Sequence, residues 1–66
     1  MITIQLSKDI QLIHEPDTEK LYLSDGWNTD YIELMNSPSG YVMDGYFNLT
    51  ADDRNIIGQY IEENLR

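Results

Sequence analysis

His14 is the only histidine in the chain, and histidine is the residue most often used for general acid–base catalysis. No cysteine or serine motif accompanies it, and Glu15-Pro16 directly after it is typical of a turn. Catalysis also needs a pocket that perturbs the pKa of a catalytic group. The core of a 66-residue chain leaves little room for such a pocket. We therefore expect His14 to be a surface or turn residue, and we expect no enzymatic activity.

Residues 25–30 (DGWNTD) place three side chains with oxygen ligands around a glycine, which faintly resembles calcium-loop chemistry. The segment lacks the alternating ligand spacing and the distal bidentate glutamate of a true calcium loop. The chain has no cysteine for a zinc site and no glycine-rich loop followed by lysine to hold a phosphate. The sequence therefore predicts neither a metal nor a cofactor.

The middle of the chain is acidic and aromatic at the same time. Residues 21–53 contain no lysine or arginine, yet they contain six acidic residues and six of the seven aromatic residues. The basic residues are scattered in the flanks, at Lys8, Lys20, Arg54 and Arg66. Because affinity for phosphates comes from clustered basic side chains, we expect no direct binding to nucleic acid.

A second acidic group lies at Glu15, Asp17 and Glu19, which are spaced by two residues. In an extended strand these carboxylates would lie on one side at intervals of about 6.6 Å, from a rise of about 3.3 Å per residue. Such a row could imitate the phosphates of a nucleic acid. Pro16 and the neighbouring polar residues favour a solvated turn instead.

Apolar residues alternate with polar ones over most of the chain, which predicts β-strands. Residues 2–6 and 10–14 form either a hairpin or one long strand with a bulge, and residues 20–24 form the next strand. Residues 31–35 are a further extended run that also fits one turn of helix. Residues 41–49 form a fifth run, interrupted by Asp44-Gly45. Turns are expected at residues 15–18 and 24–28, and a loop at residues 36–40.

The last sixteen residues, 51–66, are predicted to be helical. Thr50 is a natural N-cap, and Asp53 lies at the capping-box position three residues later. One apolar face follows the helical spacing and comprises Ile56, Ile57, Tyr60, Ile61 and Leu65. We interpret Gly58, close to this face, as a place where the helix approaches the sheet closely.

The chain has 66 residues and a net charge of −8, and its pI is about 4.1. It has no basic N-terminal region, secretory apolar stretch or membrane-length apolar run. We expect a soluble, cytoplasmic protein, in the host cytoplasm if a phage encodes it. Residues 1–66 are predicted to be a single acidic α+β domain: a small antiparallel sheet of four or five strands with one C-terminal amphipathic helix packed on one face. The opposite face, with Tyr22, Ile13 or Ile32 on it, would be polar or an interface.

The leading functional hypothesis is a small inhibitor or regulator that docks on a basic partner protein, such as a nucleic-acid-binding protein or nuclease. Carboxylates would speed association and aromatic anchors would slow dissociation. The expected partner-binding residues are Glu15, Asp17, Glu19, Asp25, Trp27, Asp30, Tyr31, Glu33, Asp44 and Tyr46. In size, acidity and lack of cysteine, the chain resembles phage inhibitors of bacterial defence nucleases, including anti-CRISPR proteins, which implies a nucleic-acid mimic. An immunity protein against a nuclease toxin is a related expectation.

The alternative is a structural or assembly module. It would form a homodimer or join a larger complex through the uncovered face of the sheet, and its acidity would serve only solubility. The two hypotheses differ in where the acidic side chains lie. A mimic needs them clustered on one surface, whereas a solubility role scatters them.

Overall fold

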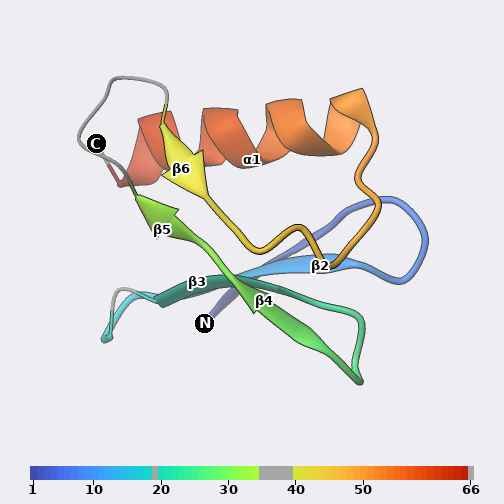
Figure 1. Ribbon diagram of the computed structural model, residues 1–66. Coiled ribbons are helices and arrows are strands. Elements are labelled where there is room, and N and C mark those ends of the chain that lie inside the picture. The colour runs from blue at the N-terminus through green and yellow to red at the C-terminus, as the bar shows by residue number, and fades with distance from the viewer. Residues whose placement is uncertain (19, 35–39, 66) are drawn as a thin grey trace.

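A computed structural model describes residues 1–18, 20–34 and 40–65 of the chain. Glu19 and Met35, which belong to segments discussed above, lie outside the described residues. The described elements are β1 (Ile2–Gln5), β2 (Gln11–Glu15), β3 (Lys20–Ser24), β4 (Thr29–Tyr31), β5 (Glu33–Leu34), β6 (Tyr41–Val42) and α1 (Ala51–Asn64). A four-stranded antiparallel sheet, a two-stranded sheet and one C-terminal helix make a small α+β fold (Figure 1), which confirms the predicted class.

The four-stranded sheet has the order β1-β2-β3-β4, so consecutive strands are neighbours. Its first two strands form a hairpin rather than one bulged strand, with Ile2 opposite His14 and Gln5 opposite Gln11. The connecting loop turns at Lys8, whose φ of 56° is unusual for a residue with a side chain. The amide N–H of Leu6 donates to the carbonyl of Ile10 at 2.9 Å and closes this loop.

The segment after β4 continues as strand, not as a turn of helix. In β5, Glu33 pairs with Val42 and Leu34 pairs with Tyr41, both in β6. Ile32 connects the two sheets, and its N–H donates to the carbonyl of Leu21 at 2.9 Å. Because its side chain is 7% exposed and belongs to the core, the expectation that Ile32 lies on the uncovered face is wrong.

The helix packs over one face of the four-stranded sheet (Figure 1). Its capping box is confirmed: the Thr50 hydroxyl accepts from the Asp53 N–H, and the Asp53 carboxylate accepts from the Thr50 N–H. The same carboxylate accepts from both the backbone N–H and the hydroxyl of Ser7, which ties the helix start to the β1–β2 loop. These bonds, led by the one from the Ser7 hydroxyl, hold the pKa of Asp53 below its ordinary value.

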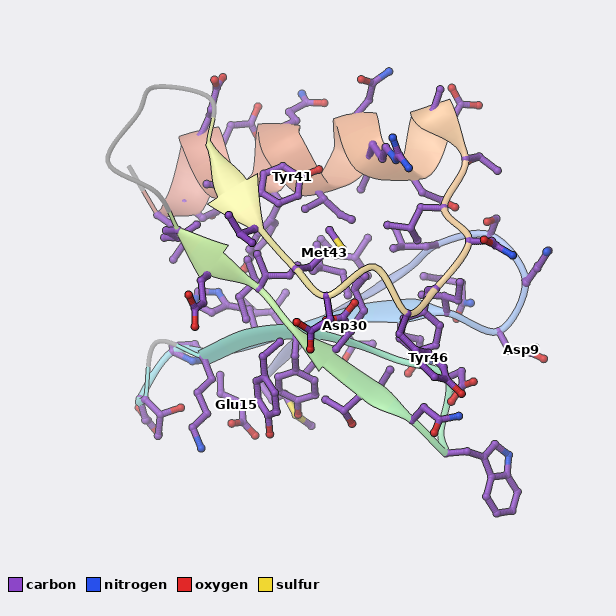
Figure 2. All side chains as sticks on the ribbon, viewed as in Figure 1. Asp9, Glu15, Asp30, Tyr41, Met43 and Tyr46 are labelled. Atoms are coloured by element: carbon purple, nitrogen blue, oxygen red, sulfur yellow. The ribbon has the colours of Figure 1, made fainter. Side chains whose placement is uncertain are left out.

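The core lies between the helix and the sheet. Its buried members are Leu6, Ile10, Leu12, Leu21, Leu23, Ile32, Ile57, Tyr60 and Ile61. Tyr41 and Met43 pack against this cluster from the segment that runs between helix and sheet (Figure 2). Of the predicted apolar face of the helix, Ile56 is an exception, because 36% of its surface stays exposed.

Two further expectations, on His14 and on Gly58, are wrong. His14 is 7% exposed, because its position in β2 directs it to the helix side, where its Nδ1 lies 2.5 Å from the Tyr60 hydroxyl oxygen. The rings of His14 and Tyr60 meet edge to face, with centroids 5.5 Å apart. At Gly58 an added Cβ would meet nothing within 4 Å, so no close helix–sheet approach requires glycine there.

Among the residues described, no helix has both the length and the apolar character needed to cross a membrane.

Candidate functional site

The face of the sheet opposite the helix carries a row of side chains that crosses all four strands. Leu12 and Leu23 point into the core, so their sequence neighbours point the other way. The register places Thr3 opposite Ile13, Ile13 opposite Tyr22, and Tyr22 opposite Tyr31. We call the row Thr3, Ile13, Tyr22 and Tyr31 the open face.

Two tyrosines form the aromatic part of the open face. The rings of Tyr22 and Tyr31 lie 5.4 Å apart, at a distance that is favourable for aromatic pairs. Tyr31 is 56% exposed, although it is large and mostly apolar. Tyr22 is half-buried. A paired aromatic surface of this kind is typical of protein interfaces.

Glu15 borders the tyrosine pair. The Tyr22 hydroxyl donates to Glu15 Oε1 at 3.4 Å, and Glu15 lies on the side of the sheet away from the helix (Figure 2). Partial burial first, and then the Glu15 carboxylate, raise the pKa of the Tyr22 hydroxyl. The open face therefore keeps Tyr22 as a neutral hydrogen-bond donor beside a negative charge.

Trp27 projects from the turn that joins β3 to β4. Its side chain is 93% exposed, the largest exposed fraction of any large apolar residue described here. The turn itself is ordered by hydrogen bonds. Asp25 Oδ1 accepts from the N–H groups of Trp27 and Asn28 at 2.8 and 2.7 Å, and the Asp25 N–H donates to the Asn28 carbonyl at 3.3 Å. We call residues 24–28 the Trp27 turn.

The chemistry of the Trp27 turn keeps it both rigid and charged. Gly26 has a φ of +93°, a left-handed conformation that residues with side chains rarely adopt. Backbone N–H donation from Asn28 and then from Trp27 lowers the pKa of Asp25. The turn therefore presents an exposed indole next to a carboxylate that stays ionised at neutral pH.

The position of Asp30 contradicts its predicted role as a partner-binding residue. It was expected to contact a partner, but its side chain is 2% exposed and lies on the core face of β4, opposite Leu23. Its carboxylate accepts three backbone N–H groups, from Asp44 at 3.0 Å, Gly45 at 3.0 Å and Tyr46 at 3.1 Å. Asp30 is therefore a structural anchor for the segment after β6, and not a surface contact.

This anchoring explains why the predicted fifth run is a strand only over Tyr41–Val42. Successive N–H groups can converge on one anion when the backbone between them turns. Gly45, with a φ of +82°, permits that turn. As a result the Asp44 side chain is exposed and Tyr46 is 63% exposed, with its ring edge-on to Phe47 at 5.1 Å.

The structure brings some predicted residues together and separates others. Glu15 and Tyr31 border Tyr22 on the open face, and Trp27 lies at the end of the same β3–β4 hairpin. Asp17 is exposed in the β2–β3 turn, so Glu15 and Asp17 do not continue one extended row. Glu19 lies outside the described residues. Glu33 is exposed on the two-stranded sheet, two residues after the end of β4.

Tyr22 was missing from the predicted site, although the sequence contained the signal for it. Lys20 and Tyr22 alternate with Leu21 and Leu23, and the two leucines are buried at 3% and 0% exposure. The same period-two pattern that predicted the strand therefore already placed Tyr22 on the face away from the core.

A shallow groove of about 520 Å³ lies outside this site, lined by Tyr41, Val42, Met43, Gly45, Phe47, Asn48, Leu49 and Arg54. None of its lining residues was predicted to bind a partner. Among the described residues, no group of three or more histidine, aspartate or glutamate side chains is arranged to hold a metal ion.

No protein family model, curated protein sequence or solved structure matches this chain. The functional argument therefore rests on the geometry of the open face and the Trp27 turn.

Proposed function

We propose that this protein is a small acidic inhibitor or regulator that binds a basic partner protein through the open face and the Trp27 turn. The observation that carries the proposal is the 93% exposure of Trp27 on a turn held by Asp25 and Gly26. Tryptophan and tyrosine supply most of the binding energy at many protein interfaces.

The order of the Trp27 turn supports binding rather than accidental exposure. An anchor side chain on a flexible loop loses conformational entropy when it binds, which weakens the complex. The two N–H bonds to Asp25 Oδ1 already fix the backbone on which Trp27 is mounted. Docking would then bury the indole with little further ordering of the chain.

The charge of the chain supports a basic partner. A net charge of −8 on 66 residues creates a negative field that speeds association with a positive surface. Among the predicted residues, Glu15 and Asp25 lie beside the aromatic anchors. A nucleic-acid-binding protein or nuclease has a positive groove of the required kind, and occupying it would inhibit that protein.

The test is affinity capture from a bacterial lysate with the tagged protein, followed by washes in rising salt or with added DNA. Trp27→Ala removes the anchor, and Asp25→Asn removes a charge while its Oδ1 can still accept the two N–H bonds of the turn. Thr18→Ala alters another exposed turn and is the matched control. Retained proteins are identified by mass spectrometry and their binding is then measured with purified material.

We expect a basic protein that the wild type and Thr18→Ala retain, that Trp27→Ala loses, and that Asp25→Asn releases at lower salt. Displacement by DNA would identify the binding groove as the site and support the nucleic-acid-mimic form of the proposal. Retention that ignores DNA would support an inhibitor that binds outside that groove. Equal retention by the wild type and Trp27→Ala would refute the proposed site.

A further inference from the structure

We propose that β1 pairs with β1 of a second copy of this chain, in antiparallel orientation, so that two four-stranded sheets join into one. This surface is the free backbone edge of the sheet, and it lies away from the Trp27 turn. It shares Thr3 with the open face: the side chain of Thr3 belongs to the open face, and its backbone groups belong to the edge. The argument rests on the hydrogen-bond pattern of β1, its lack of charge and the position of Ile2.

Within the part of the chain that the structure describes, the outer edge of β1 presents backbone groups that pair with no other strand. In an antiparallel pair, residues alternate between those that bond to the partner strand and those that point away. The Leu6 N–H donates to Ile10, so by this alternation Ile4 and Ile2 also bond to β2. The N–H and carbonyl groups of Thr3 and Gln5 therefore point to the outer edge, where β1 has no further neighbour in the described sheet.

The sequence of β1 lacks the charged side chains, proline and bulges that often protect an edge strand, although the strand is short, at four residues. Proteins block such edges with charged side chains, proline or bulges. The strand reads Ile-Thr-Ile-Gln, with no charge and no proline, and its pairing with β2 is regular over all four residues. An uncharged edge offers nothing specific to a basic partner, whereas it can pair with its own copy.

Ile2 supplies the second argument. It lies opposite the buried His14, on the core face of the sheet, yet 43% of its surface is exposed. Thr3 and Gln5 are the edge-bonding residues, so a two-fold axis at Ile4 pairs Thr3 with Gln5 of the second copy. Ile4 then faces its own copy and Ile2 lies beside Leu6 of that copy, which extends the core across the axis.

The two copies would repel each other, since each carries a net charge of −8. Added salt screens this repulsion and should strengthen the dimer. Binding to a basic partner, by contrast, should weaken with salt. The dimer and the partner complex should therefore respond to salt in opposite directions. Either proposal can fail in these measurements without the other failing. An interface four residues long is below the standard size, so we expect a dissociation constant between about 1 µM and 1 mM.

The first experiment is sedimentation equilibrium of the purified protein over a range of concentrations, at low and high salt. Thr3→Lys adds a charge at the free edge, and Thr18→Lys adds the same charge on the β2–β3 turn as a control. We expect the wild type and Thr18→Lys to approach twice the monomer mass at high concentration. Thr3→Lys should weaken dimerisation at least tenfold.

A second experiment tests the register without relying on affinity. The chain has no cysteine, so single cysteine variants report only contacts between copies. At the two-fold axis, Ile4→Cys would face itself at about 4.5 Å between Cα atoms, which suits a disulfide. We expect Ile4→Cys to cross-link under mild oxidation at least tenfold faster than Thr18→Cys. A wild type that stays monomeric at the highest concentration and salt, or equal cross-linking by the two variants, would overturn the proposal.

Discussion

Replacing Asp30 by Asn tests whether this buried carboxylate holds the segment that carries Asp44 and Tyr46. Asp30 Oδ1 accepts from the Asp44 N–H, and Oδ2 accepts from the N–H groups of Gly45 and Tyr46. An asparagine has one carbonyl oxygen and an NH2 group in place of the second oxygen. At best it keeps two of these bonds and places a donor against the remaining N–H.

The expected cost follows from that mismatch. A buried donor left without its acceptor costs about 1–3 kcal/mol, and bonds to a charged acceptor lie at the upper end of the usual range. We therefore expect Asp30→Asn to lower the free energy of unfolding by about 2–3 kcal/mol. Asp30→Ala would deprive all three N–H groups of their acceptor. For a domain whose total stability is roughly 3–10 kcal/mol, that variant risks complete unfolding.

The assay is urea denaturation followed by far-ultraviolet circular dichroism. Trp27 fluorescence is a poor probe, because an indole that is 93% exposed in the folded state changes its surroundings little on unfolding. Asp44→Asn is the matched control, since it removes the same charge from an exposed side chain and should change stability by no more than about 0.5 kcal/mol. Amide exchange at residues 44–46 should also become faster in Asp30→Asn. Equal stability of the two variants, with unchanged exchange at residues 44–46, would refute the anchoring role.

Three further predictions concern the stability of the fold. Gly58→Ala should stabilise it by about 1 kcal/mol in urea denaturation, because the added Cβ meets nothing within 4 Å and alanine favours helix; destabilisation would restore the close-approach interpretation. Ile57→Ala should cost about 2–5 kcal/mol by the same method, since Ile57 is 0% exposed in the core, and a smaller cost would place the helix elsewhere. Asp53 has a lowered pKa in the folded state. Its stabilising contribution should therefore be complete above the pKa of the ordinary carboxyl, 3.8, and should be lost as the pH falls from there through the folded-state pKa. Acid titration of thermal stability should therefore be steeper for the wild type than for Asp53→Asn, and parallel curves would contradict this.

Local sequence patterns predicted the first three strands and the helix, whereas they did not separate β4 from β5 or predict the two-stranded sheet. Alternation in residues 20–24 predicted β3, and Thr50 with Asp53 marked the helix start at Ala51. The patterns could not decide between strand and helix for the segment after Tyr31. That choice depended on pairing of Glu33 and Leu34 with β6, which lies across a loop in the sequence.

The candidate site was predicted in part. The turn at Asp25-Gly26 was predicted from its residues, which fix the local backbone conformation, and the predicted anchor Trp27 is 93% exposed there. Asp30 was misassigned, since its role depends on backbone N–H groups that are fourteen or more residues away. Burial of His14 was missed for a similar reason: the Tyr60 hydroxyl that satisfies it comes from the helix, 46 residues later.

Composition and local periodicity act over short distances along the chain, so they were enough to predict the fold class, the acidity and the turn that carries Trp27. Which acids remain on the surface and which ones hold the protein together depends instead on contacts that form when the chain folds. Asp30 and Asp53 have the same side chain as Asp44, yet the first two are buried at 2% and 3% exposure and the third is exposed. The physical reason is that a buried carboxylate is tolerated only where folding supplies N–H and O–H donors, and here those donors come from distant segments.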